Sequence, residues 1–180
     1  MRDKKSIQGL FALALILILT AFASCSSSSD NTLTPPSATT GLIVTVTTSG
    51  TGGSYAPRNV AAIWIENSAG AFVKTLTVYA QARQSDLTNW NTSSSGNRVD
   101  AITGATQSNV GTIYGAWNGT DVAGKVVADG TYKVCMELTD KSTTGNFSTF
   151  AFTKGTAAVT LTPANVPSFS AISLKWIPLL

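Results

Sequence analysis

The residues best suited to chemistry lie in one short segment, 100–106, with the sequence Asp-Ala-Ile-Thr-Gly-Ala-Thr. Thr106 offers a hydroxyl nucleophile, and Gly104 leaves the backbone before it uncrowded, so a modifying enzyme could reach that hydroxyl. Asp100 could orient the segment or meet the modifying enzyme. The chain is rich in Thr, Gly and Ala, and Asp-x-x-Thr-Gly is also common in turns. A purely structural role for the segment therefore stays open.

The chain contains no histidine. This excludes Ser-His and Cys-His nucleophilic pairs and the commonest zinc sites. No other nucleophile–base pair or metal-ligand cluster is visible, which favours a carrier or a binding module over an independent enzyme. Without residues 1–24, basic and acidic residues number 9 and 8. A charge so close to balance does not indicate nucleic acid as a partner.

The first 24 residues have the layout of a secretory signal peptide. A basic start (Arg2, Lys4, Lys5) is followed by an apolar run at 10–19 and by small residues that end at Cys25. Ala-Ser-Cys resembles a lipobox, which implies that Cys25 is lipidated and becomes the mature N-terminus; the alternative is an uncleaved signal anchor. We expect a lipid-anchored protein of the cell envelope, on the periplasmic face of the outer membrane or at the cell surface.

The mature chain is predicted to hold a tether and one all-β domain. Residues 25–40 are rich in Ser, Thr and Pro and should be flexible, whereas 41–180 should fold. Runs rich in β-branched and aromatic residues, separated by Gly, Asn and Asp, predict an Ig-like antiparallel β-sandwich of about 7–9 strands. The runs lie at 42–47, 60–66, 72–79, 112–117, 125–127, 131–138, 147–153, 157–161 and 172–176.

Residues 81–111 contain no convincing strand and read as one long mid-domain loop. Loops of this length are usually functional or disordered, and its apolar residues argue against disorder. A functional site is therefore expected here first.

Three aromatic or thiol-bearing features admit both a packing and a functional interpretation. Trp117 and Trp176 lie in strands and should belong to the core. Trp64 and Trp90 could pack the long loop or cover a planar cofactor. Cys135 lies in an apolar run, which predicts a buried thiol rather than a reactive one.

The segment Trp117-Asn118-Gly119-Thr120-Asp121, with Asp129-Gly130-Thr131-Tyr132 after it, predicts tight hairpin turns at its two glycines. It resembles the Ig-like domain of flagellar hook-capping proteins. The resemblance covers about a quarter of the mature chain and bears on the fold alone.

A wider resemblance covers residues 56–178. Ala-Pro-Arg-Asn-Val-Ala-Ala-Ile-Trp-Ile-Glu at 56–66, Trp90, the 100–106 segment and Trp-Asn-Gly-Thr-Asp at 117–121 are similar to a family of predicted periplasmic proteins, domain of unknown function 2271. The resemblance implies a gene neighbourhood with PepSY-type membrane reductases and FAD:protein FMN transferases.

Asp-x-x-Thr-Gly-Ala-Thr is also similar to the acceptor motif for covalent flavinylation. This resemblance implies FMN esterified to Thr106, with Asp100, Thr103, Gly104 and Trp90 near the flavin. The leading hypothesis is a membrane-anchored redox carrier; the alternative is a non-catalytic Ig-like binding or structural lipoprotein of the envelope.

Overall fold

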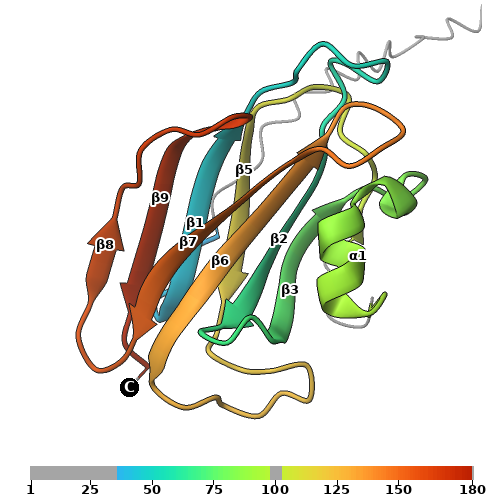
Figure 1. Cartoon of the computed structure of the whole chain (residues 1–180). Helices are drawn as coiled ribbons and strands as arrows, with labels where there is room; N and C mark the ends of the chain where they lie inside the picture. The colour runs from blue at the N-terminus through green and yellow to red at the C-terminus, as the bar shows by residue number, and fades with distance from the viewer. Residues whose placement is uncertain (1–35, 98–102, 180) are drawn as a thin grey trace, which may run out of the picture. The chain divides into compact units, whose positions relative to one another are not determined.

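The computed structural model describes residues 36–97 and 103–179, which lie in one compact unit. The signal segment with Cys25, most of the tether, and Asp100 lie outside the described residues. Figure 1 shows the order of the elements along the chain. The described strands are β1 (Gly41–Thr48), β2 (Val60–Asn67), β3 (Phe72–Tyr79), β4 (Thr103–Gly104), β5 (Thr112–Trp117), β6 (Gly130–Thr139), β7 (Asn146–Lys154), β8 (Val159–Leu161) and β9 (Phe169–Ile177).

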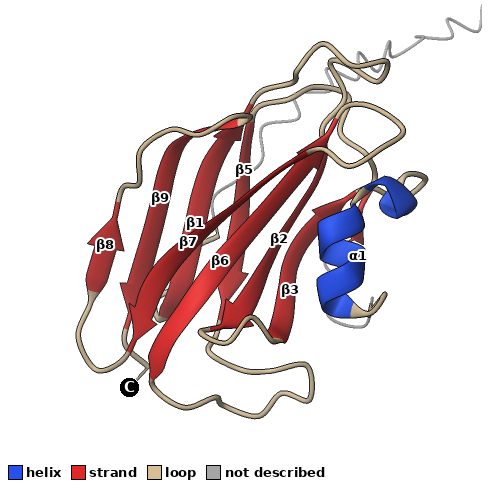
Figure 2. Ribbon diagram, viewed as in Figure 1, coloured by secondary structure: helices blue, strands red, loops and turns tan. Residues whose placement is uncertain are grey.

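The strands form two sheets, ordered β5-β1-β9-β8 and β4-β3-β2-β6-β7. Every pairing is antiparallel except that of the two-residue strand β4, which runs parallel to β3. Nearly all of the ribbon in Figure 2 is strand or loop. The prediction of an all-β sandwich is confirmed.

The main core lies between the two sheets and is built from alternate residues of the strands. Along β1, Leu42, Val44 and Val46 are completely buried, as the alternating pattern of this strand predicts. Trp117 and Trp176 pack against each other in this core with ring centroids 6.2 Å apart. The core role predicted for these two tryptophans is confirmed.

A second apolar cluster lies on the outer face of the β3-β2-β6 sheet. Helix α1 (Thr88–Ser94) packs against this face through Trp90 and lies beside β3 in Figure 2. The members of the cluster are Val60, Ala62, Trp64, Val78, Ala80, Leu87, Trp90 and Cys135. This sheet is therefore apolar on both faces, which explains why β2 is buried along Val60–Ile65 without alternation.

The prediction of a single long loop at 81–111 is wrong in its detail. The segment contains a 3-10 turn (Gln84–Asp86), α1 and β4. A helix of seven residues is too short to show a sustained period and is unstable by itself, so its stability comes from packing. Here Leu87 and Trp90 anchor it to the sheet.

The predicted strand at 125–127 is also wrong. Only an isolated bridge joins Thr120 to Val126, because Asp121 closes a tight turn instead: its Oδ1 accepts the N–H groups of Ala123 and Lys125, each at 2.9 Å. β5 and β6 belong to different sheets, so the connection at 118–129 crosses between sheets and is not the simple hairpin that the sequence predicted.

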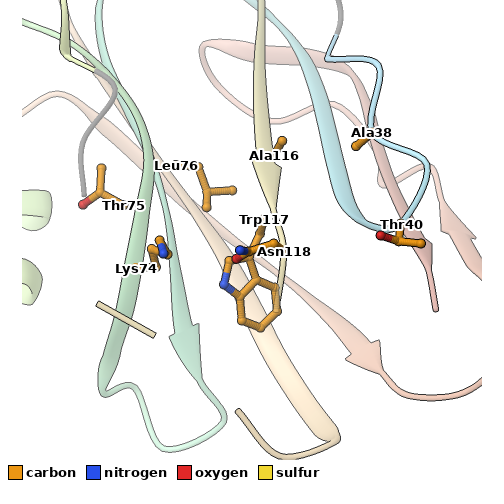
Figure 3. A pocket seen from close by; sticks show the side chains of 8 residues that line it. All are labelled: Ala38, Thr40, Lys74, Thr75, Leu76, Ala116, Trp117 and Asn118. Carbon is orange, nitrogen blue, oxygen red and sulfur yellow. The ribbon is translucent and has the colours of Figure 1, made fainter. Parts of the chain in front are cut away.

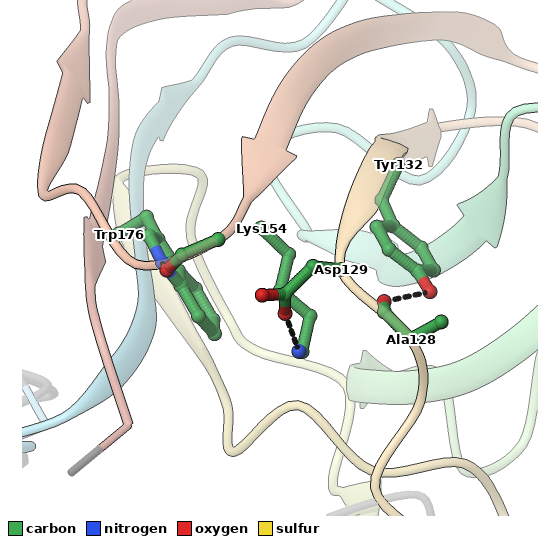
Figure 4. Close-up of polar contacts among 6 residues, drawn as sticks. Ala128, Asp129, Tyr132, Lys154 and Trp176 are labelled. Atoms are coloured by element: carbon green, nitrogen blue, oxygen red, sulfur yellow. Dashed lines mark hydrogen bonds and ion pairs between the residues drawn. The ribbon is translucent and has the colours of Figure 1, made fainter.

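Asp129 forms an ion pair instead of a tight hairpin turn. Its carboxylate lies 2.5 Å from the Lys154 ammonium, whose side chain is only 4% exposed, and the Tyr132 hydroxyl donates to the Ala128 carbonyl nearby (Figure 4). Gly119 has φ 76°, and a Cβ there would lie 3.1 Å from Cε of Lys154. The glycine thus provides both the backbone conformation and the space for the lysine stem.

Candidate functional site

Thr106 lies between two points at which the backbone is fixed. Before it, β4 pairs with the end of β3, placing Gly104 opposite Tyr79. After it, Gln107 forms a bridge with Asn59, whose N–H donates to the Gln107 carbonyl at 3.0 Å and whose side-chain amide donates to Oε1 of Gln107 at 3.1 Å. Thr106 itself is half-buried. Its hydroxyl is therefore carried on a short segment that is held at both ends.

Two arginines share a cavity with this hydroxyl-bearing residue. Arg58, Ala82, Arg83, Thr106 and Ser108 line an open cavity of about 380 Å³. Arg58 precedes β2 and Arg83 follows β3, so the sheet brings Arg58, Arg83 and Thr106 together although they lie 23 to 48 positions apart in the sequence. Guanidinium groups donate well to phosphate oxygens, often in pairs. The cavity thus combines a hydroxyl that can be esterified with two cations that suit the charge of a phosphate ester.

Arg83 is held in place by an aromatic ring. Its guanidinium carbon lies 3.4 Å from the centroid of the Tyr55 ring, a close cation–π contact. The Tyr55 hydroxyl in turn donates to Asp86 at 3.3 Å and makes a hydrogen bond with Ser142. Such contacts reduce the number of conformations that Arg83 would lose on binding an anion.

The loop that carries Tyr55 and Arg58 is organised around a buried carboxylate. Asp140 accepts the Thr51 N–H at 2.5 Å, the Thr51 hydroxyl at 2.8 Å and the Gly53 N–H at 3.0 Å, while its own carbonyl accepts the Tyr55 N–H at 2.7 Å. Burial opposes ionisation of this carboxyl group, but the hydrogen bonds from Gly53 and Thr51 outweigh it and lower the pKa of Asp140.

The residues that the sequence grouped as one site have different surroundings in the structure. Thr103 and Gly104 form β4 next to Thr106, whereas Asp100 lies outside the described residues. Trp90 is completely buried, and its indole N–H donates to the Thr75 hydroxyl at 3.0 Å. This placement matches the packing interpretation of Trp90. The two arginines were missed, because only the tertiary structure brings them to Thr106.

Helix α1 is fixed by Glu137, a completely buried residue of β6. Its Oε1 accepts the backbone N–H and the side-chain amide of Asn89 at 3.2 and 2.9 Å, and its Oε2 accepts the Trp90 N–H at 2.8 Å. The carboxylate therefore takes the role of an N-terminal cap supplied from another element.

Cys135 is a free, completely buried thiol, as the sequence predicts. Burial is the main cause that raises the pKa of this thiol, and the nearby Glu66 carboxylate adds to it. Because the thiolate is the reactive form, this cysteine is unreactive in the folded protein.

A second cavity, of about 250 Å³, lies between β3 and β5 (Figure 3). Lys74 and Trp117 line it, but the Lys74 ammonium already donates to the Thr120 hydroxyl at 3.1 Å and to the Asp121 carbonyl at 3.2 Å. The indole N–H of Trp117 likewise donates to the Thr120 carbonyl at 2.7 Å. These polar groups support the Trp-Asn-Gly-Thr-Asp loop, so this cavity is a weaker candidate.

Residues 36–97 and 103–179 contain neither a candidate membrane-spanning helix nor a candidate metal site. No helix there is both long and apolar enough to cross a membrane. No three His, Cys, Asp or Glu side chains there are grouped so that they could hold a metal ion.

Comparison with known proteins yields one family. Residues 42–165 match the family described as "Predicted periplasmic protein (DUF2271)". The matched range includes Arg58, Arg83 and Thr106, and the description agrees with the predicted export to the envelope. No curated protein and no solved structure gives a significant match. Because the match covers well over half of the sequence, the chain belongs to the DUF2271 family of predicted periplasmic proteins.

Proposed function

We propose that this protein is an exported redox carrier with FMN esterified to Thr106. The observation that carries the proposal is the cavity in which Thr106 lies with Arg58 and Arg83. A phosphodiester keeps one negative charge, and two guanidinium groups can neutralise it and orient it. The residues present therefore fit the phosphate end of FMN.

The attachment step requires FAD and an FAD:protein FMN transferase. The Thr106 oxygen attacks the phosphorus of the FMN half of FAD, and the hydroxyl proton leaves. The bond from this phosphorus to the oxygen that bridges the two phosphates breaks, AMP departs with the bridging oxygen, and the proton passes to water. No electron is transferred in this step. Thr106 supplies the oxygen that remains in the product, while Arg58 and Arg83 stabilise the esterified phosphate.

FMN, once attached, supplies the redox chemistry, which needs no histidine or other acid–base pair from the chain. The chain then acts as a scaffold that holds the phosphate group of FMN beside the ends of β2 and β3, where Arg58, Arg83 and Thr106 lie. We further propose that lipidated Cys25 anchors the domain to a membrane of the envelope, where a PepSY-type membrane reductase exchanges electrons with it.

The test is co-expression of the exported chain with an active FAD:protein FMN transferase. The mass should rise by one FMN less one water, and the denatured band should fluoresce, because a phosphodiester survives unfolding. Thr106→Ala should abolish both signals. Ser108→Ala is the matched control, because Ser108 lines the same cavity and should not be needed for labelling.

Two further variants separate attachment from recognition. Thr103→Ala should at most weaken the labelling. The double variant Arg58→Gln/Arg83→Gln should be labelled at least about tenfold more slowly, because the phosphate loses both guanidinium groups. A colourless wild-type protein with ample FAD would overturn the redox proposal, and labelling that persists in Thr106→Ala would show that another residue is the acceptor.

A further inference from the structure

A third cavity lies on the outer face of the second sheet, between α1 and β7. It has a volume of about 350 Å³, and Trp64, Glu66, Asn89, Thr92, Ser93 and Phe147 line it together with Gly70. The lining combines two aromatic rings, one carboxylate, one amide and two hydroxyls. The proposed flavin cavity has none of these residues.

The aromatic part of this cavity is flat and partly open to solvent. Phe147 stacks on Trp64 with ring centroids 5.5 Å apart and planes 16° apart. Trp64 is completely buried, whereas Phe147 is 41% exposed and is one of three large apolar side chains exposed in the described part of the chain. The buried indole supports the phenyl ring from below, so the ring presents a fixed apolar surface.

The polar part of the cavity is centred on Glu66. Its Oε1 accepts the Trp64 indole N–H at 2.9 Å and the Ser93 hydroxyl at 2.7 Å, which fixes the carboxylate. Gly70 lies beside the other oxygen, since a Cβ placed on it would be 4.0 Å from Oε2 of Glu66. Glu66 is thus an oriented acceptor beside the aromatic surface.

Helix α1 adds neutral hydrogen-bonding groups to the same cavity. Asn89 is held by the bond from its side-chain nitrogen to Glu137 at 2.9 Å, which leaves its carbonyl oxygen on a fixed side chain. Thr92 lies one turn further along the helix, and its hydroxyl donates to the Thr88 carbonyl at 2.8 Å. Several oriented polar groups beside a mainly apolar surface are typical of small-ligand sites.

We propose that this cavity binds a saccharide. A pyranose ring has an apolar C–H face that stacks on a flat aromatic ring, and hydroxyls at its edge that donate to carboxylate and amide oxygens. Phe147 offers the first surface, and Glu66 and Asn89 offer the acceptors. A simple amine would use the carboxylate and the ring but would leave the amide and hydroxyl groups without a role. Saccharide binding would hold the domain on a glycan of the envelope.

The test measures saccharide binding to the full exported chain in detergent by isothermal titration calorimetry. The Thr106→Ala variant serves as the parent, so that flavin attachment has no influence on the result. The probes are tetrasaccharides of β-1,4-linked N-acetylglucosamine, β-1,4-linked glucose and α-1,4-linked glucose. At least one should bind with one site per chain.

Phe147→Leu should weaken that binding about tenfold, because it removes the aromatic face while keeping an apolar cover over Trp64. Phe147→Tyr should retain binding. Thr149→Ala is the matched control on the same face of β7 and should change nothing. The melting temperature of each variant shows whether the domain is still folded.

Failure of all three probes to bind would overturn the proposal, as would equal binding by Phe147→Leu. If a lysine tetrapeptide binds instead and Glu66→Gln removes that binding, the cavity takes cations and the saccharide assignment is wrong.

Discussion

The anchoring of α1 by Glu137 gives the most direct test of the structural reasoning. Glu137→Gln preserves the shape of the side chain but replaces one carboxylate oxygen with an NH₂ group. The three donors on α1 lie at 2.8 to 3.2 Å from the two oxygens. The amide of this variant can place its oxygen at the position of either carboxylate oxygen. The better choice is the position of Oε1, which keeps both hydrogen bonds from Asn89 but places the NH₂ group next to the Trp90 N–H, so that two donors face each other.

The expected loss follows from that single donor–donor contact. A buried polar group left without a partner costs about 1–3 kcal/mol. Removing the buried negative charge offsets part of this cost. We therefore expect Glu137→Gln to lower the free energy of unfolding by about 2 kcal/mol. For a domain of this size, the melting temperature should fall by roughly 6 °C.

The assay is thermal and urea unfolding of the purified chain, with hydrogen exchange followed at the Asn89 and Trp90 amides. Both amides should exchange faster in Glu137→Gln, since the cap opens before the sheet does. Thr149→Ala, on a solvent-facing position of the same sheet, is the control. A variant within about 0.5 kcal/mol of wild type would refute the capping argument.

Four further predictions concern the rest of the chain. Because the pKa of Asp140 is lowered in the folded state, its contribution to stability should be complete above about pH 4 and lost as the pH falls through the folded value; Asp140→Asn should remove that part of the acid unfolding curve. Gly119→Ala should cost about 1–2 kcal/mol in urea unfolding, because φ is 76° and the new methyl would press on Lys154; an unchanged midpoint would contradict this. Cys135 should resist iodoacetamide in the native protein and react once urea unfolds it, as mass spectrometry can show; native labelling would disprove its burial. Cys25→Ala should release the protein from the membrane fraction with the domain still folded, and a variant that stays membrane-bound after a salt wash would refute lipid anchoring.

Much of the architecture could be predicted from residue patterns. Eight strands were placed to within a few residues, because alternating or β-branched runs such as Leu-Ile-Val-Thr-Val-Thr favour extended backbone that is buried on one face. The turn between β2 and β3 uses Asn and Gly, the residue types that separate the runs: Gly70 has φ 86°, and Asn67 Oδ1 accepts the Ala71 N–H at 2.9 Å. Such features depend on neighbours in the sequence.

Helix α1 and the short strand β4 could not be predicted, because neither is stable from local interactions. α1 depends on Glu137, 47 residues from Trp90, and β4 depends on pairing with the end of β3. The predicted strand at 125–127 is wrong because its local sequence favours a strand but the tertiary structure provides no partner. These residues have no neighbouring strand to pair with, apart from the isolated bridge between Thr120 and Val126. The backbone N–H of Lys125 instead donates to Asp121 Oδ1 in the turn.

The candidate site divides in the same way. The sequence alone determined that no histidine chemistry is available, and it supplied the resemblance of the Thr106 segment to a flavinylation motif. Only the tertiary structure placed Arg58 and Arg83 in the cavity of Thr106, because they reach it from different strand ends. It also decided that Trp90 faces the sheet, since the buried Thr75 hydroxyl provides a partner for its indole N–H. Side chains distant in sequence meet only where strand pairing brings their backbones together, and the pairing of β2 with β3 and β6 is set by burial on both faces of the sheet.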